Sequence, residues 1–320
     1  MTTDAAPNPV VEAPRSDVMT RRRGRGRRTG SSAWAYLILV PGCLLFLAPL
    51  AWLVSASFQP IGEIFSYPPK WIPENPTLDG YKKFLGIGDF AVEGASGAWR
   101  WFLNSAIVAI AVTTLQLFFN SLAAYVFAKR DFPGRNAIFV LFLATMMIPG
   151  QVTLIPNYLV LKHMPLFGGN DILGQGGSGW LDSYYGLILP SAVSAFGIFL
   201  LRQYMLSIPD ELLDAARIDG ASEFKIYARI VMPLCGPALA ANGIFIFMAS
   251  WEDFFWPLII VSSPELYTAP LGLALYVVAN RTQWDILMAG SVLATIPMVL
   301  VFIFFQRRFV QGISLSGMKG

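Results

Sequence analysis

The residue types that most often carry catalysis or bind metals are scarce in this 320-residue sequence. It contains one histidine, His163, so it cannot form a His-rich metal site or a paired-histidine relay. Its two cysteines, Cys43 and Cys235, form no CxxC pair and lie in or beside apolar stretches, so a disulfide framework is unsupported. The sequence also lacks a GxxxxGK(S/T) phosphate-binding loop. We therefore expect a chain that binds no metal or cofactor itself and hydrolyses no ATP.

One group of polar residues lies inside an apolar stretch. Thr113, Gln116 and Asn120 are spaced three and four residues apart, so they share one face of a helix. Such a face suits either a water-lined path or hydrogen bonds between neighbouring helices. We favour the interhelical bonds and keep the path as the alternative, with Gln116 and Asn120 as its candidate lining residues.

A later apolar stretch has a face that combines polar and aromatic residues. This face comprises Asn242, Phe245, Ala249, Glu252 or Asp253, and Trp256. Acidic residues inside a membrane span are costly and usually functional, and aromatic rings beside polar groups can stack on the C–H faces of sugars. Because the two acids lie toward one end of the stretch, they can instead meet water or cap a break before Pro257.

Membrane-spanning helices must position these residues. Only 13% of the chain is charged and 55% is hydrophobic, whereas a soluble domain carries roughly 25% charged residues. The composition therefore indicates an integral membrane protein. A spanning helix needs about 20 apolar residues, and six stretches approach that length. They cover residues 34–58, 102–128, 137–161, 184–201, 237–261 and 286–305.

Two of the six stretches carry residues that interrupt a helix. Pro149 and Pro156 interrupt the third stretch. The fifth is interrupted by Glu252, Asp253 and Pro257. We expect breaks at these points.

The basic residues predict the orientation of the chain in the membrane. The tail before Trp34, the loop 129–136, the segment 202–236 and the end after Phe305 hold 7, 3, 4 and 3 lysines or arginines, whereas the intervening loops hold 6 of the 23. Loops rich in these residues stay in the cytoplasm. Both termini are therefore predicted to be cytoplasmic.

The amino-terminal tail, residues 1–33, is basic and poor in residues to bury, so we expect disorder. Its arginine run, residues 21–28, is compatible with nucleic acid or anionic lipid. A positive flank before the first span is the plainer interpretation and implies no nucleic-acid partner. A cleaved signal peptide is a further alternative, because Ser55-Ala56-Ser57 follows the apolar run. That run is about 25 residues, long for a signal peptide, so we interpret it as a retained anchor.

Two connections between spans have distinctive compositions. Residues 59–101, which with the first span make up the unit 34–101, contain five prolines and aromatic residues that suit the membrane interface. These aromatic residues are Trp71, Tyr81, Trp99 and Trp101. Residues 165–183 contain six glycines and read as a flexible insertion.

The segment 202–236 is the longest polar stretch between spans and is predicted to be structured. Ser207 and Asp210 form a helix start signal with Pro209 in the first turn. Gly220 predicts the end of this helix.

Ser222 is expected to cap a second helix, which Pro233 ends. Residues 210–223 hold five acids and one arginine, whereas a helix lying on an anionic bilayer would have a basic polar face.

The same segment carries a recognisable motif. Asp214-Ala215-Ala216-Arg217-Ile218-Asp219-Gly220-Ala221, followed by Met232-Pro233-Leu234, resembles the EAA loop of ABC-importer permease subunits, with Asp214 where glutamate is usual. Trp71-Ile72-Pro73, Asn104-Ser105 and the run Trp251–Leu258 resemble landmarks of the carbohydrate-uptake branch, which includes maltose-type and glycerol-phosphate-type importers. Glu252 stands where asparagine is expected, and the insertion 165–183 is not part of the pattern.

This resemblance implies an all-α integral membrane fold of six transmembrane helices with a cytoplasmic coupling helix, the type I permease fold of ABC importers. It implies that the loop 204–236 docks on a cytosolic ATPase dimer, which would bind ATP and Mg. The coupling residues carried over from the motif are Asp214, Ala215, Ala216, Asp219, Gly220, Ala221 and Pro233. The other implied partners are a second permease subunit in a heterodimer, an extracytoplasmic solute-binding protein and membrane lipid.

The function implied is half of the translocation pathway for a sugar or sugar-like solute, in a prokaryotic plasma membrane. The core would be residues 102–308, followed by a cytoplasmic tail, 309–320. Whether this chain or the second permease holds the substrate stays open.

Two other classes of membrane protein, a secondary transporter and a membrane enzyme, fit the sequence less well. A self-sufficient secondary transporter needs ionisable residues deep in several spans, but only the fifth span has acidic residues. A membrane enzyme would gather acids around one centre, whereas the acids here are dispersed. Neither alternative accounts for the motif.

Overall fold

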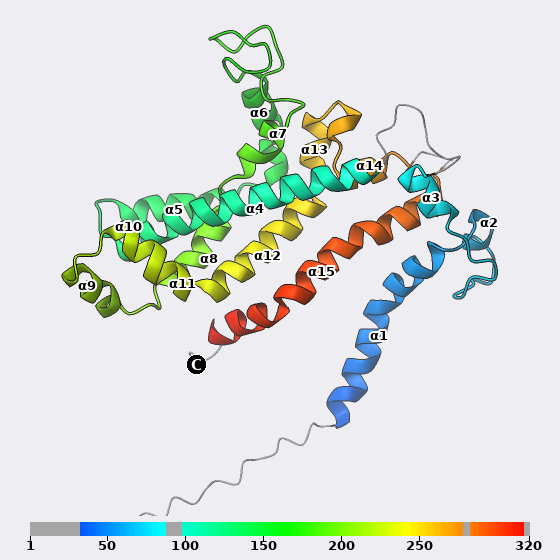
Figure 1. The fold of residues 1–320 in the computed structure, drawn as a ribbon, viewed down its shortest axis with the longest axis horizontal. Coiled ribbons are helices and arrows are strands. Elements are labelled where there is room, and N and C mark those ends of the chain that lie inside the picture. The colour runs from blue at the N-terminus through cyan, green and yellow to red at the C-terminus, as the bar shows by residue number, and fades with distance from the viewer. Residues whose placement is uncertain (1–32, 88–97, 278–281, 317–320) are drawn as a thin grey trace, which may run out of the picture. The chain divides into compact units, whose positions relative to one another are not determined.

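The computed structural model describes residues 33–87, 98–277 and 282–316, and within these ranges all regular structure is helical (Figure 1). The predicted tail 1–33 lies outside the described residues except for Ala33. Of the described residues, 33–48 belong to one compact unit and those from 49 onward belong to a second. The helices are α1 Ala33–Ala56, α2 Ile61–Ile64, α3 Asp79–Leu85, α4 Ala98–Lys129, α5 Arg135–Thr145, α6 Gly150–Lys162, α7 Tyr184–Ile188, α8 Ala195–Met205, α9 Asp210–Ile218, α10 Glu223–Ile226, α11 Met232–Leu234, α12 Gly236–Glu252, α13 Phe255–Ile260, α14 Ala269–Ala274 and α15 Trp284–Ser316. Short 3₁₀ turns cover Leu189–Ser191 (η2) and Pro264–Leu266 (η4), and a π-helical stretch, η3, covers Tyr227–Val231.

The first unit contains the beginning of α1, which is apolar along its whole length. By length and composition, α1, α4 and α15 can each cross a membrane alone. Three further spans are helix pairs that bend at a short break, by 99° between α5 and α6, 41° between α7–η2 and α8, and 79° between residues 223–234 and α12. Counting each bent pair as one span gives six, as predicted.

The predicted breaks are only partly where the structure has them. Pro149 precedes α6 and marks the sharp bend, as expected. Pro156 lies inside α6 without ending it, because a membrane helix tolerates the loss of one backbone donor when neighbouring groups compensate. In the fifth span, α12 ends at Glu252, Asp253 is extended, and Pro257 sits in the first turn of α13, where its missing N–H costs little.

The last helix is longer than the sequence predicted. The expected sixth span ends at residue 305, but α15 continues to Ser316. The candidate span within it is Trp284–Gln306, close to the predicted 286–305, and residues 309–316 continue the helix beyond that span. Residues 317–320 lie outside the described part of the chain.

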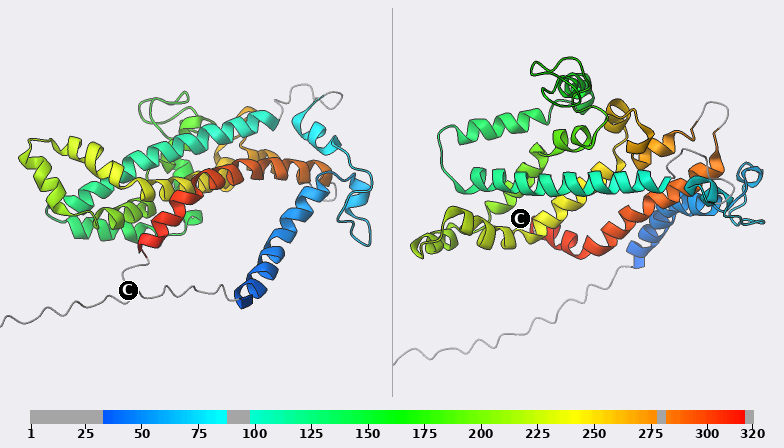
Figure 2. Two further views of the ribbon diagram at one scale, coloured as in Figure 1. Left: turned by 60° about the horizontal axis from the view of Figure 1, so that its bottom comes forward. Right: turned by 45° about the horizontal axis from the view of Figure 1, so that its top comes forward.

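The second unit is built around α4, which packs most extensively against α8 and α12, while α12 also packs against α15 (Figure 2). Small residues on α4, including Ala109 and Ala124, are fully buried. Small side chains let helix backbones approach closely in membranes, where packing rather than the hydrophobic effect holds helices together. The two ends of α4 therefore reach two different groups of polar residues in the same unit.

At its first turns α4 is tied to the segment after α13. The side-chain amide of Asn104 donates to the carbonyls of Glu265 and Tyr267 at 2.8 and 2.9 Å. The Tyr184 hydroxyl donates to Asn104 Oδ1 at 2.6 Å. One asparagine thus joins three segments that are far apart in the sequence.

The glycine-rich loop before α7 has a defined backbone rather than the flexible form expected of it. A Cβ on Gly177 would lie 2.2 Å from the Gly168 carbonyl oxygen, so the two segments of the loop that contain these residues can approach each other only with glycine at position 177. The amide of Asn170, which is 8% exposed, donates to the Lys162 and Met164 carbonyls at 2.8 and 3.0 Å. The glycines here serve close contact, not mobility.

Asp182 fastens this loop to the residues that follow α13. Its Oδ1 accepts from the backbone N–H groups of Ser262 and Ser263, both at 2.9 Å, and the Ser263 hydroxyl donates to its Oδ2. Burial opposes ionisation of Asp182, but the hydrogen bonds from Ser263 and Ser262 outweigh it and lower the pKa of the carboxyl.

Candidate functional site

The first candidate site is the charged segment, residues 206–234, which contains α9, α10, η3 and α11. Asp210 and Glu211 lie in the first turn of α9, near the positive end of the helix dipole. The residue that precedes the helix is Pro209, and no side chain caps it. Ser207 is therefore not the cap that the sequence predicted: its hydroxyl donates to the Tyr204 carbonyl at 2.7 Å and closes the end of α8 instead.

The second residue predicted to cap a helix, Ser222, does not cap it either. Ser222 occupies the position before α10 but makes no side-chain capping bond. Pro233 does not end the second helical stretch either. It lies within α11, and the sharp bend follows at Cys235.

The end of α9 is where the sequence placed it. Gly220 has φ +78°, in the left-handed region that favours glycine. Its N–H donates to the Arg217 carbonyl at 3.0 Å, and the Ala221 N–H donates to the Ala216 carbonyl at 2.9 Å. A Cβ on Gly220 would meet no heavy atom within 4 Å. The requirement for glycine is therefore conformational rather than one of space within the chain.

The residues carried over from the motif divide into an exposed and a packed group. Asp214, Ala215, Asp219 and Gly220 are exposed, as is Pro233 on α11. Ala216 and Ala221 are partly buried against an apolar cluster around Leu213, whose side chain is fully buried. The structure thus brings six of the seven onto α9 and the turn after it, and sets Pro233 apart.

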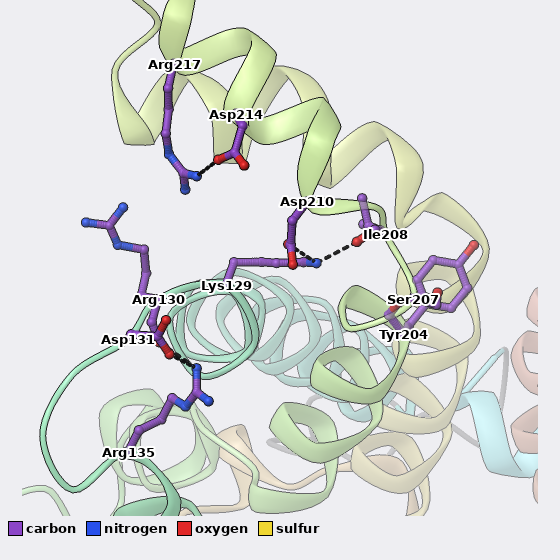
Figure 3. Close-up of polar contacts among 10 residues, drawn as sticks. All are labelled: Lys129, Arg130, Asp131, Arg135, Tyr204, Ser207, Ile208, Asp210, Asp214 and Arg217. Atoms are coloured by element: carbon purple, nitrogen blue, oxygen red, sulfur yellow. Dashed lines mark hydrogen bonds and ion pairs between the residues drawn. The ribbon is translucent and has the colours of Figure 1, made fainter.

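A buried lysine ties the start of α9 to the end of α4 (Figure 3). Lys129 Nζ donates to the Ile208 carbonyl at 2.6 Å and pairs with Asp210 Oδ1 at 2.7 Å. The Lys129 side chain is 3% exposed, whereas that of Asp210 is 75% exposed. A buried ammonium needs such partners, because an unpaired one is strongly unfavourable. Lys129 therefore fixes where α9 begins relative to α4.

Glu223 forms a second tie at the other end of α9. Its Oε1 lies 2.5 Å from Arg130 Nη1 and accepts from Arg217 Nε at 3.0 Å, and its Oε2 accepts from the Tyr125 hydroxyl at 2.7 Å. Arg217 also donates to Asp214 Oδ1 at 2.6 Å. Bonds to Glu223 and Asp214 raise the pKa of Arg217 above its usual range, so the guanidinium stays charged.

Sequence reasoning did not find this bracing. In the sequence, Lys129 and Arg130 indicate only the orientation of the spans, and Glu223 is one of five acids in residues 210–223. The only sequence signal was the pairing of basic residues at a span end with acids in the next polar segment, and that signal specifies no contact. The residues that hold α9 come from positions up to 98 apart in the chain.

The second candidate site is a cavity of about 440 Å³ among α4, α7, α8, α12 and α13, here called the central cavity. Its lining is Val108, Val112, Gln116, Leu187, Ser191, Ser194, Phe196, Asn242, Phe245, Ile246, Ala249, Ser250, Asp253, Trp256, Pro257 and Thr268. A volume of this size, an apolar wall and a few polar groups are typical of small-molecule sites.

Five of the seven predicted pathway residues line this cavity, namely Gln116, Asn242, Phe245, Asp253 and Trp256. Asn120 and Glu252 do not. Asn120 Oδ1 accepts from the Ser194 N–H at 3.0 Å, so Asn120 makes the interhelical bond that the sequence favoured. Glu252 ends α12 with its side chain exposed. The break after it places Asp253 on the cavity wall and Glu252 off it.

The sequence missed the polar residues that other segments supply to the cavity. These are Ser191, Ser194 and Thr268, whereas Ser250, which was also missed, lies on α12 itself. Ser191 and Ser194 flank the break between η2 and α8, and Thr268 precedes α14, so no helical spacing links them to α4 or α12. Gln116 was predicted either to line a path or to form an interhelical hydrogen bond, and it does both. It lines the cavity, and its amide donates to the Ser191 carbonyl at 2.7 Å.

Comparison with known proteins adds to this geometry. A family model described as "Binding-protein-dependent transport system inner membrane component" matches residues 116–315, which include the charged segment and every lining residue of the cavity except Val108 and Val112. Among curated relatives, the arabinooligosaccharides transport system permease protein AraQ of Halalkalibacterium halodurans is 38% identical over 274 residues, covering 85% of this chain and 91% of that one. The sn-glycerol-3-phosphate transport system permease protein UgpE of Salmonella choleraesuis is 32% identical over 288 residues, covering 89% and 97%.

A solved structure has the same fold. A chain of a bacterial ABC transporter involved in the import of the acidic polysaccharide alginate superposes with a TM-score of 0.71 at 22% identity, covering 87% of this chain and 95% of that chain. This likeness covers most of the chain and shows a shared fold.

Proposed function

This chain belongs to the family of binding-protein-dependent transport system inner membrane components, and on that premise we propose that it forms half of the translocation pathway of an ATP-driven sugar importer and couples to a cytosolic ATPase through residues 204–236. As a member of this family it is a multi-pass membrane transport subunit rather than an enzyme. ATP and Mg would act in the partner ATPase.

The observation that carries the proposal is the form of α9. This helix and the turn after it expose Asp214, Ala215, Asp219 and Gly220, here called the exposed run, while buried Lys129 and the Glu223 cluster brace both ends of α9 against α4. An exposed acidic helix offers charge-assisted hydrogen bonds to a partner surface. A helix braced at both ends passes a displacement on to the span that holds it, instead of yielding locally.

The remaining parts of the assembly follow from the family and the charge pattern. The family is defined by dependence on a binding protein, so an extracytoplasmic solute-binding protein is the outer partner. A second permease subunit would complete a heterodimer, with lipid around the spans. The excess of basic residues on the same side as the charged segment supports a cytoplasmic location for that segment and for both termini, with the spans in a prokaryotic plasma membrane.

A sugar is the proposed solute. The AraQ relative is named for arabinooligosaccharides and the UgpE relative for sn-glycerol 3-phosphate, and both names describe polyhydroxylated molecules. The higher identity is with the arabinooligosaccharide permease.

The test begins with purification of the tagged chain from gently solubilised native membranes and identification of co-purifying proteins by mass spectrometry. The proposal expects an ATPase with a phosphate-binding loop and a second permease. The recovered complex is then reconstituted with its binding protein, and uptake of labelled arabinotriose is measured with ATP inside the vesicles. Transport by the purified chain alone, driven by an ion gradient with no ATPase recovered, would instead identify a secondary transporter.

A further inference from the structure

The central cavity contains polar groups that the chain itself leaves without partners. Asn242 on α12 is fully buried, and neither its Nδ2 nor its Oδ1 has a hydrogen-bond partner among the described residues. Thr268, 4% exposed, has an unpartnered Oγ1 within the same part of the chain. Buried polar groups are nearly always hydrogen-bonded, so such a cluster calls for an explanation.

The fold makes room for the amide rather than crowding it out. Gly197 on α8 faces the two asparagines, and a Cβ there would lie 2.2 Å from Asn120 Nδ2 and 3.2 Å from Asn242 Nδ2. Asn120 uses its own amide on Ser194. Asn242 is left as the amide at the wall of the cavity.

Aromatic rings supply the apolar part of the lining. Phe196 and Phe245 are each 45% exposed, and their ring centroids lie 6.5 Å apart at 80°. The Trp256 indole N–H donates to the Gly186 carbonyl at 3.0 Å, which fixes the ring against the wall. Apolar walls with a few placed hydrogen-bonding groups are what an amphipathic solute such as a sugar ring requires.

The charge of the lining discriminates between kinds of solute. Among the described residues that line the cavity, Asp253 carries the only ionisable carboxylate and none is lysine or arginine. Anionic groups are normally bound by arginine, lysine or helix N-termini. A phosphate or uronate in this cavity would meet a carboxylate without a counter-charge.

We propose that the central cavity is a binding site for one unit of an uncharged sugar, in which Asn242 and Thr268 bond its hydroxyls and the carboxylate of Asp253 disfavours anionic solutes. This inference rests on the proposed function and assigns substrate contact to this chain itself. Because Asn242 is inaccessible in the described conformation, the sugar reaches it when α8 and α12 separate during transport.

The first test measures protection of an introduced thiol in the solubilised complex of both permeases and the ATPase. Ser250→Cys, on the cavity wall, is made in a Cys43→Ser background and modified with a small methanethiosulfonate. We expect arabinotriose to slow modification about fivefold, as one or two neutral hydrogen bonds would allow, and sn-glycerol 3-phosphate to leave the rate unchanged. Asn136→Cys, exposed in the first turn of α5, is the matched control that neither solute protects.

The second test measures uptake kinetics in the complete reconstituted transporter. Asn242→Leu keeps the size of the side chain, so it should raise the KM for arabinotriose about fivefold while Vmax and membrane content stay unchanged. Thr114→Val, on the exposed face of α4, serves as the control.

An unchanged KM in Asn242→Leu together with an unprotected Ser250→Cys overturns the proposal, as does equal protection by sn-glycerol 3-phosphate. Loss of ATP-driven sugar uptake in the wild-type complex would refute the proposed function instead, so the two failures are distinguishable.

Discussion

The charged segment and the central cavity both depend on α4, yet they treat polar groups in opposite ways. At the end of α4, Lys129 is paired with Asp210, and Glu223 bonds Arg130, Arg217 and Tyr125 within the chain. Halfway along the same helix, α4 borders a cavity where Asn242 has no partner among the described residues.

This difference in hydrogen bonding corresponds to a difference in the role proposed for each region. A polar network that is satisfied internally is rigid and keeps one geometry. Polar groups that the chain leaves unsatisfied are costly unless something else bonds them. We therefore propose that the charged segment transmits a movement and that the cavity receives a solute.

The largest effect is expected from a change in the exposed run of α9. Gly220→Glu should abolish uptake while the protein remains in the membrane, because a non-glycine residue at φ +78° is strained by roughly 1–2 kcal/mol and a bulky anion is added to the docking run. Uptake and membrane content measure the two effects separately. Asn136→Glu adds the same charge in the first turn of α5 as a control, and normal uptake in Gly220→Glu would contradict the coupling role.

The next effect concerns the buried lysine. Lys129→Met removes the bonds to the Ile208 carbonyl and to Asp210, and the loss of a buried partner costs about 1–3 kcal/mol. We expect a lower apparent melting temperature of the complex and weaker stimulation of its ATPase by the loaded binding protein. Lys129→Arg, which keeps the charge, should recover part of both; equal damage by the two substitutions would show that size, not charge, matters here.

A smaller effect is expected at Glu223. Its ion pairs are partly exposed, and such pairs contribute about 0.2–1 kcal/mol. A double-mutant cycle of Glu223→Gln and Arg130→Gln, read from melting temperatures, should show coupling between the two sites. Strict additivity would mean that the cluster does not act as one tie.

The smallest effect on stability is expected in the cavity. Asn242→Leu should leave the melting temperature unchanged or slightly higher, because the substitution removes an unpartnered buried amide. A drop comparable with that of Lys129→Met would place Asn242 in a structural network and remove the contrast between the two regions.

The sequence predicts the six spans well because long apolar runs carry a strong signal. It also places the end of α9, since Gly220 has the residue type that a left-handed turn requires. The break at Pro149 and the interrupted fifth span follow from the same local rules.

The remaining features depend on contacts that no local pattern encodes. Ser207 and Ser222 have the right residue type for caps, but neighbouring groups take their hydrogen bonds or leave them unused. Gly168 and Gly177 read as flexible, although they permit close backbone contact. Thr268 reaches the cavity from a different segment, and Glu223 reaches Arg130 from 93 residues away, so only the folded chain shows them together.

The most direct test of these two roles, coupling by the charged segment and solute binding by the cavity, compares the uptake kinetics of Lys129→Met and Asn242→Leu. Both variants are measured side by side in the reconstituted transporter. We predict that Lys129→Met lowers Vmax for arabinotriose with KM unchanged, and that Asn242→Leu raises KM with Vmax unchanged. The reverse pattern, or the same change in both variants, would contradict it.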